Sequence, residues 1–162
     1  MKLGILSDTH DQLARCERAV ALLQSAGAEE LIHCGDITEP EIIAACAVLP
    51  CHFVFGNNDY RTVSVLRSIA KETGANGLEL GGVIELAGKT IAVTHGHLGV
   101  EIRRLLATQP NYLLSGHTHV VEDYREGSTR FINPGALHRA RQFTVAILDL
   151  SADVLEFIPV PR

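Results

Sequence analysis

Five short polar clusters separate apolar segments of this chain, and their residue types suit the binding of divalent metal ions. Imidazole nitrogens and carboxylate oxygens, with no thiolate required, are typical ligands of Mn²⁺, Fe²⁺, Ni²⁺ and Zn²⁺. Four of the clusters also contain a glycine, which allows sharp turns and close backbone approach. The clusters are Asp8-Thr9-His10, Gly35-Asp36, Gly56-Asn57-Asn58-Asp59, His95-Gly96-His97 and Gly116-His117-Thr118-His119.

The spacing within two clusters favours a shared site. Asp8 and His10 are two residues apart, as are His117 and His119. On an extended backbone, residues i and i+2 point to the same side, so each pair can direct two donor atoms toward one point. Each motif alone is an ordinary loop feature. Their joint occurrence, each after a predicted strand, indicates a single metal-binding site.

Apolar runs of strand length and amphipathic runs of helix length predict the elements that position these clusters. Strands are expected at residues 2–6, 30–34, 51–55, 83–86, 90–94, 112–114, 129–132, 144–150 and 154–160, and helices at about 11–25, 40–49, 61–72 and 100–107. Alternation of strands and helices, followed by a strand-rich half, predicts an α/β fold in which two sheets form a sandwich with helices outside. No linker or repeat interrupts residues 1–162, so one domain is expected.

The predicted order of elements also explains how the clusters could meet. In open α/β sheets, ligands collect at the carboxyl ends of the strands, where the connecting loops converge on one edge. Each polar cluster follows a predicted strand. We therefore expect all five to lie together.

Composition excludes several classes of partner. Hydrophobic residues make up 46% of the 162 residues and charged residues 20%, which is typical of a globular domain. The net charge of −5 gives no general basic field, so nucleic acid is not expected as the main partner. No apolar run approaches the roughly 18 residues of a membrane-spanning helix, so no membrane contact is expected. A phosphate-bearing ligand would have to be held locally, for example by metal ions.

The cysteines and the N-terminus favour a cytoplasmic protein. Four cysteines occur without C-x-x-C spacing and lie in or beside apolar runs, so we expect free thiols. The first residues lack the apolar core of a signal peptide.

The order of the polar clusters resembles that of the calcineurin-like metallophosphoesterase superfamily, in particular its small single-domain bacterial and archaeal phosphodiesterases. The family pattern is D-x-H, G-D, G-N-[HC]-[DE], H-G-H, G-H-T-H and often N-P-G-S. This chain has a counterpart of each motif over nearly its full length, the last being Asn133-Pro134-Gly135-Ala136. The resemblance implies two mixed β-sheets flanked by helices, and hydrolysis of a small phosphate ester.

The resemblance also implies two divalent metal ions, with Mn²⁺ favoured over Ni²⁺, Fe²⁺ or Zn²⁺. One ion would take Asp8, His10, Asp36 and His119, and the other Asp36, Asn57, His95 and His117, so that Asp36 bridges them. Two ions at about 3.5–4 Å lower the pKa of a shared water and clamp the attacking and leaving oxygens. We expect a metal-bridging hydroxide as the nucleophile, without a covalent enzyme intermediate.

Two positions depart from the family pattern. The family often has histidine after the ligand asparagine, whereas this chain has Asn58, which can donate a hydrogen bond but not a proton at neutral pH. Esters with poor leaving groups should therefore react slowly unless His97 or a metal-bound water replaces the missing acid. Asp59 is expected to orient its neighbours, which makes Asn58, Asp59 and His97 the predicted catalytic group. Ala136 in place of serine is expected to matter little.

The other histidines and two arginines carry weaker expectations. His33 is expected to lie in the core or behind the metal ligands, and His52 to have no role. His138, Arg139 and Arg141 follow the N-P-G turn and could contact a substrate phosphate or form a solvated basic loop.

Three alternatives differ in function or reaction. A non-catalytic protein-interaction scaffold of the same fold, like the retromer subunit, is disfavoured because all seven ligand positions carry competent residues. A structural zinc domain is disfavoured because such sites are usually closed and cysteine-rich. Phosphomonoester hydrolysis remains an alternative to the phosphodiesterase assignment. Apolar strand edges in the C-terminal half leave a homo-oligomer open.

Overall fold

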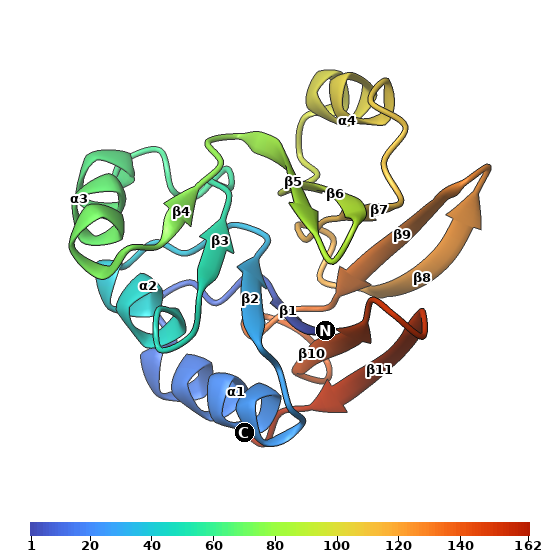
Figure 1. Ribbon diagram of the computed structural model, residues 1–162. Helices are drawn as coiled ribbons and strands as arrows, with labels where there is room; N and C mark the ends of the chain where they lie inside the picture. Colours follow the sequence, from blue (N-terminus) through green and yellow to red (C-terminus); the bar gives the residue numbers. More distant parts are fainter.

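Two β-sheets form the framework of the protein in the computed structural model, which describes all residues from Met1 to Arg162. The first sheet contains β1 (Lys2–Leu6), β2 (Glu30–His33), β3 (Cys51–Phe53), β4 (Asn76–Gly77), β10 (Thr144–Asp149) and β11 (Val154–Pro159). The second contains β5 (Gly81–Leu86), β6 (Lys89–Thr94), β7 (Tyr112–Leu114), β8 (Val121–Glu126) and β9 (Thr129–Pro134). Figure 1 shows both sheets side by side.

Both sheets are mixed, as the family resemblance implied. The first has the order β11-β10-β1-β2-β3-β4, in which β1 to β4 are parallel, β10 pairs antiparallel with β1, and β11 pairs antiparallel with β10. The second has the order β5-β6-β7-β9-β8, with β6, β7 and β9 parallel and antiparallel strands at both edges. The predicted α/β sandwich is confirmed.

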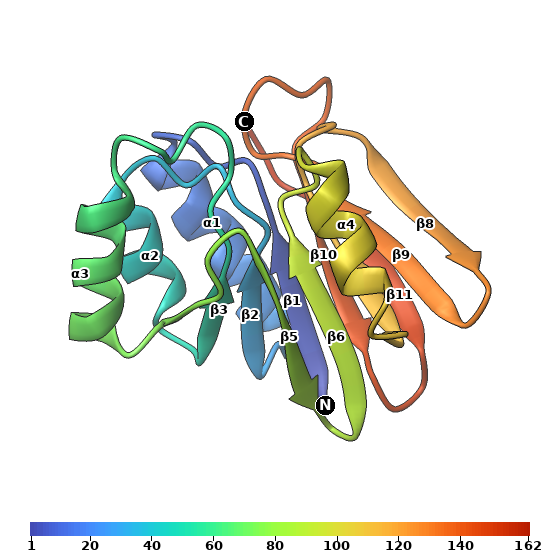
Figure 2. The same ribbon diagram turned by 90° about the horizontal axis from the view of Figure 1, so that it is seen from above.

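Helices cover the outer faces of the sandwich. The helices are α1 (Leu13–Ser25), α2 (Pro40–Cys46), α3 (Val63–Thr73) and α4 (Gly99–Leu106). Viewed from above, α1 to α3 lie outside the first sheet and α4 lies outside the second (Figure 2). None of the four helices is long and apolar enough to span a bilayer.

Apolar side chains on both faces of the first sheet hold the layers together. Leu3 and Ile5 of β1 belong to a 13-residue cluster between the two sheets, whereas Leu6 belongs to a 21-residue cluster under α1, α2 and α3. Burial on both faces explains why β1 reads as a nearly continuous apolar run and why the centre of β2 consists of Leu31 and Ile32. The carboxyl ends of these strands are thereby fixed in relation to one another.

Two strands were not predicted from the sequence. β8 has the sequence VEDYRE and is polar on both faces, because it is an exposed edge strand that pairs only with β9. Its Asp123 contacts Arg130 of β9 at 2.7 Å. β4 has only two residues and carries no periodic signal.

Candidate metal centre

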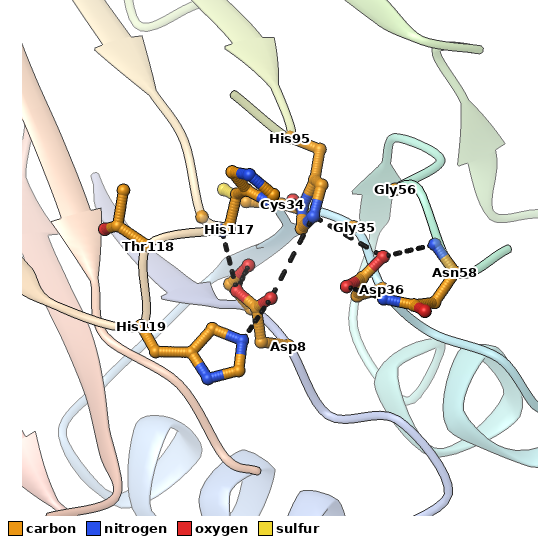
Figure 3. A network of polar contacts seen from close by, with 12 residues as sticks. Asp8, Cys34, Gly35, Asp36, Gly56, Asn58, His95, His117, Thr118 and His119 are labelled. Carbon is orange, nitrogen blue, oxygen red and sulfur yellow. Dashed lines mark hydrogen bonds and ion pairs between the residues drawn. The ribbon is translucent and has the colours of Figure 1, made fainter. Parts of the chain in front are cut away.

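The five polar clusters meet at one edge of the sandwich, in the loops that follow β1, β2, β3, β6 and β7. Backbone hydrogen bonds join these loops directly, since the Asp8 N–H donates to Gly35 O at 3.0 Å and the His10 N–H to Asp36 O at 2.9 Å. A third bond runs from Gly116 N–H to His95 O at 3.0 Å. The expected convergence therefore occurs (Figure 3).

Two groups of side chains in this edge could each hold a metal ion. Asp8, His10 and His119 form one group, and Asp8, Asp36 and His95 form the other. Within each group, one donor atom from every residue lies within 4.8 Å of the others. Asp8 is common to both groups, so the two potential sites are adjacent.

The fully buried carboxylate of Asp8 offers one oxygen to this space. Its Oδ2 accepts hydrogen bonds from the Ser7 hydroxyl at 2.6 Å and the His117 N–H at 3.0 Å. Its Oδ1 lies 3.0 Å from His119 Nε2 and 4.0 Å from His95 Nε2, without hydrogen-bond geometry to either. Oδ1 is therefore the oxygen available to a cation.

Asp36 lies between His10 of the first group and His95 of the second group. Its Oδ1 is 3.4 Å from His95 Nε2, and its Oδ2 is 3.6 Å from His10 Nε2. Asn58 donates its N–H to Oδ1 at 2.9 Å and its side-chain amide to Oδ2 at 2.6 Å. Although burial opposes ionisation, the contacts with His95 and Asn58 hold the pKa of Asp36 well below its usual range. Asp36 is thus an ionised carboxylate with Oδ1 toward His95 and Oδ2 toward His10.

His95 shows most clearly that the site suits a cation. Its ring is fully buried, and Nδ1 must donate to Cys34 O at 2.8 Å because a carbonyl only accepts. Nε2 then faces Asp8 and Asp36 with no hydrogen-bond partner. Burial disfavours the charged ring, but the two carboxylates raise the pKa of His95 overall. A metal ligand typically has this form, with one ring nitrogen fixed by a carbonyl and the other free.

Backbone strain is concentrated at the predicted ligands. Asp8, His10, Asp36, His117 and His119 have φ values of 52°, 47°, 56°, 68° and 59°, in the left-handed region. For residues with a side chain this conformation costs about 1–2 kcal/mol each. Such strain clusters at functional sites, where the surrounding fold imposes it.

Two glycines permit the close approach of these loops. A Cβ at Gly56 would overlap with the carboxylate and N–H of Asp36, and one at Gly116 would overlap with Ser7 Oγ. Any larger residue at either position would displace Asp36 or Asp8. This accounts physically for the glycine beside each of these clusters.

The cluster Asn57-Asn58-Asp59 divides between the site and its support. Asn57 and Asn58 are exposed and line the cleft above the metal groups. Asp59 is fully buried and does not reach the cleft. Its two oxygens instead accept four backbone N–H groups at 2.7–3.1 Å, from Asp36, Ile37, Thr38 and Gly56. Asp59 therefore joins the loops after β2 and β3.

His117 and His97 lie on either side of His95. The His117 ring centroid is 5.2 Å from that of His95, and the exposed His117 side chain lines the cleft. The His97 ring is 5.3 Å from His95 but lines a separate groove beside the cleft. His97 Nδ1 is buried without a hydrogen-bond partner.

The cleft above the metal groups has a volume of about 580 Å³ and no hydrophobic residue in its lining. His138 and Arg139 line it, and the His138 ring lies 4.5 Å from that of His10. Arg141 does not line it. The cleft thus presents polar and charged groups to a ligand directly over the carboxylates and imidazoles.

Comparisons with known proteins agree with this geometry. The family model of the calcineurin-like phosphoesterase superfamily domain matches residues 1–153. The chain belongs to this superfamily. Among curated proteins of Methanocaldococcus jannaschii, it is 31% identical to the probable metallophosphoesterase MJ0623, over 99% of this chain and 81% of that protein. It is 28% identical to Phosphodiesterase MJ0936, over 83% of each chain.

A solved structure described as a novel archaeal phosphodiesterase superimposes on this calcineurin-like phosphoesterase with a TM-score of 0.88. The two chains are 26% identical, and the match covers 99% of this chain and 100% of the other. The family and the fold inferred from the motif order are therefore confirmed.

Sequence reasoning did not find several residues that support this phosphoesterase site. Ser7 holds Asp8, and the buried Asn133 donates to Gly116 O at 2.9 Å and accepts the Gly135 N–H at 3.0 Å. From the sequence, Asn133 was identified only as part of the N-P-G motif. The N-P-G motif in fact anchors the loop that carries His117 and His119.

His33 lies behind the site and His52 lies away from it. His33 is fully buried, accepts the Gly35 N–H at Nδ1, and contacts Thr9 Oγ1 through Nε2 at 2.9 Å. Burial lowers the pKa of His33 to about 3, so the ring is neutral. His52 contacts Glu30 at 2.5 Å and does not line the cleft.

Proposed function

We propose that this phosphoesterase is a dinuclear-metal phosphodiesterase. Asp8, His10, Asp36 and His119 would hold one divalent ion. Asp36, Asn57, His95 and His117 would hold the second, with Mn²⁺ the expected metal at both. The whole chain, residues 1–162, would act as a single catalytic domain.

The observation that carries this proposal is the environment of His95 Nε2. This buried nitrogen lies 3.4 Å from Asp36 Oδ1 and 4.0 Å from Asp8 Oδ1, and it lacks a hydrogen-bond partner. An unpaired buried polar atom costs about 1–3 kcal/mol, and a bound cation removes that cost. Asp36, with one oxygen toward His10 and one toward His95, supports a shared ligand between two ions.

When bound, two such ions would supply a hydroxide nucleophile at neutral pH and neutralise charge on the phosphate. The side chains of this protein would perform the remaining tasks. Asn58, exposed at the cleft beside Asp36, can donate a hydrogen bond to a phosphate oxygen. Asp59 would hold the loops after β2 and β3 together, and Ser7 would hold the carboxylate of Asp8 in position for an ion. His97 remains the candidate proton donor beside His95.

The names of two relatives support a diester over a monoester as the substrate, since both are described as phosphodiesterases. Phosphomonoester hydrolysis is the alternative, and the assay on both kinds of ester separates the two.

The test combines metal content with activity. The purified protein would be chelated, refilled with Mn²⁺, Ni²⁺, Zn²⁺ or Mg²⁺, and assayed on bis-p-nitrophenyl phosphate and p-nitrophenyl phosphate. We expect two ions per chain, faster hydrolysis of the diester, and no hydrolysis after chelation. His95→Ala should lose both an ion and the activity, whereas His52→Ala should keep both. A protein that binds no metal, or hydrolyses esters equally well after chelation, would refute the proposal.

A cytoplasmic location is proposed on the four cysteines, all of which are free and buried. A homo-oligomer stays a prediction from the apolar strand edges.

A further inference from the structure

A second groove lies beside the metal cleft and is lined by residues of α3 and of the segment that joins β4 to β5. Its volume is about 630 Å³, slightly larger than that of the cleft itself. Asn57 lines both cavities, and His97, whose ring is 5.3 Å from that of His95, lines the inner end of the groove. The groove is therefore adjacent to the metal cleft, with Asn57 between the two cavities.

The walls of this groove differ chemically from those of the cleft. The cleft has no hydrophobic lining, whereas the groove contains Phe55, Tyr60, Val63 and Leu80. Tyr60 is 68% exposed and Leu80 is 46% exposed. Large apolar side chains left open to solvent beside a reaction centre are typical of a binding surface.

The two oppositely charged side chains of the groove, Arg67 and Glu79, pair with each other and so add no net charge. Arg67 donates to both carboxylate oxygens of Glu79, and its guanidinium lies 5.7 Å from the ring of Phe55. A neutral groove does not suit a second phosphate or another ion. Apolar faces with donors and acceptors at the outer end suit a flat ring with polar edge groups.

The backbone that forms the groove is held in place. The Phe55 N–H donates to Glu79 O at 2.7 Å, and the Thr94 hydroxyl donates to Leu80 O at 3.1 Å. Glu79 itself has a φ of 58°, which is left-handed for a residue with a side chain. These bonds fix the backbone of Glu79 and Leu80, which line the groove.

We propose that this groove binds the aromatic ring of one ester group of the substrate while the phosphate occupies the metal cleft. This inference rests on the proposed function and narrows its substrate class to phosphodiesters that carry a planar aromatic group. The ring would stack on Tyr60, with its apolar face against Leu80 and its polar edge toward Arg67 and Glu79. Nucleosides and simple aryl alcohols both supply such a ring.

Binding of non-hydrolysable phosphonates to the Mn²⁺-loaded protein tests the proposal without a need for turnover. Calorimetry would compare methylphosphonate, phenylphosphonate and 5′-deoxythymidine-5′-phosphonate. Methylphosphonate measures the metal cleft alone, and the other two add a ring. We expect at least one ring-bearing ligand to bind about tenfold more tightly than methylphosphonate, as expected for stacking of one ring on an aromatic side chain. The stronger of the two identifies a nucleoside or a simple aryl group as the source of the ring.

Two variants in the groove and one control make the test specific. Tyr60→Ala and Leu80→Glu should both remove the preference for the ring while leaving methylphosphonate affinity unchanged. Tyr124→Ala is the control, because Tyr124 is a comparably exposed tyrosine, 48% exposed, that lies on β8 and does not line the groove. It should keep the preference.

The outcomes separate this inference from the proposed function. If methylphosphonate binds but neither ring-bearing phosphonate binds more tightly, the groove is not a subsite, whereas the proposed metal centre is unaffected by this result. An equal loss of ring preference in the Tyr124 control would also overturn the inference. If methylphosphonate fails to bind the metal-loaded protein, the proposed metal centre is wrong and the groove inference falls with it.

Discussion

Replacement of Asp59 by asparagine tests how the loops after β2 and β3 are held together. The buried carboxylate accepts four backbone N–H groups, two on each oxygen. The single amide oxygen of asparagine can keep two of these bonds, whereas its NH₂ group would face the other two donors. A hydrogen bond to a charged group contributes about 1.5–3 kcal/mol, so two lost bonds predict a decrease of at least about 3 kcal/mol in the free energy of unfolding.

Urea denaturation of the chelated protein is the appropriate assay, because bound metal would otherwise add its own stabilisation. With an m-value of about 2 kcal/mol/M, a loss of 3 kcal/mol moves the unfolding midpoint down by about 1.5 M. The expected result is a lower midpoint with an unchanged slope. In the metal-loaded protein, Asp59→Asn should also weaken metal binding, since Asp36 depends on the same N–H contacts.

Asp149→Asn provides a matched control. Asp149 also accepts several hydrogen bonds, from Ser151 and Ala152, but all of them reach the single oxygen Oδ1. An amide oxygen can replace that acceptor completely, so this variant should unfold near the wild-type midpoint. If Asp59→Asn also unfolds at the wild-type midpoint, the structural role assigned to Asp59 is wrong.

Three further predictions address the site from other directions. Gly116→Ala should lose at least one bound ion, as measured by mass spectrometry, because a Cβ at this position overlaps with Ser7. Gly127→Ala should keep both ions, because a Cβ at Gly127 meets no atom within 4 Å. Equal metal content in the two variants would contradict this prediction. Burial lowers the pKa of His33 to about 3, so the unfolded chain binds the extra proton as pH falls from 6.5, and stability should decrease between pH 6.5 and 3. In chelated His33→Gln protein, the free energy of unfolding should decrease less over this pH range. If its pH dependence equals that of the wild type, the His33 ring is not neutral in the folded chain. Asn58→His should restore a proton donor and accelerate alkyl esters up to about 10²-fold over aryl esters; equal acceleration of both would show that leaving-group protonation is not limiting.

The sequence predicted those parts of the molecule that depend on local pattern. β1 and β2 are buried on both faces, so their apolar runs stood out, and the polar residues that follow them marked the strand ends. β8 was missed because an edge strand on the surface needs no apolar face. Its place depends on pairing with β9, which is not visible in six residues taken alone.

The residues of the candidate site could be predicted from the sequence, but the residues that hold them in place could not. Asp8, Asp36 and His95 could be chosen because their types and order carry the chemistry. The structure was needed to find that Asp59 faces four backbone N–H groups and that Asn133 anchors the loop after β7. Those roles depend on contacts between residues distant in sequence, such as the 22 positions between Asp59 and Ile37. The groove beside the cleft was not predicted, because α3 and the β4–β5 segment form it together.

The left-handed backbone at five predicted ligands imposes a conformational cost that the rest of the fold must offset. Glycine would relieve the torsional penalty at these same positions. A chain with glycine in place of His117 could therefore have a higher free energy of unfolding than the natural protein, although it would lose an imidazole donor. The side chains at these five positions thus lower the stability of the fold, and only their chemistry accounts for them.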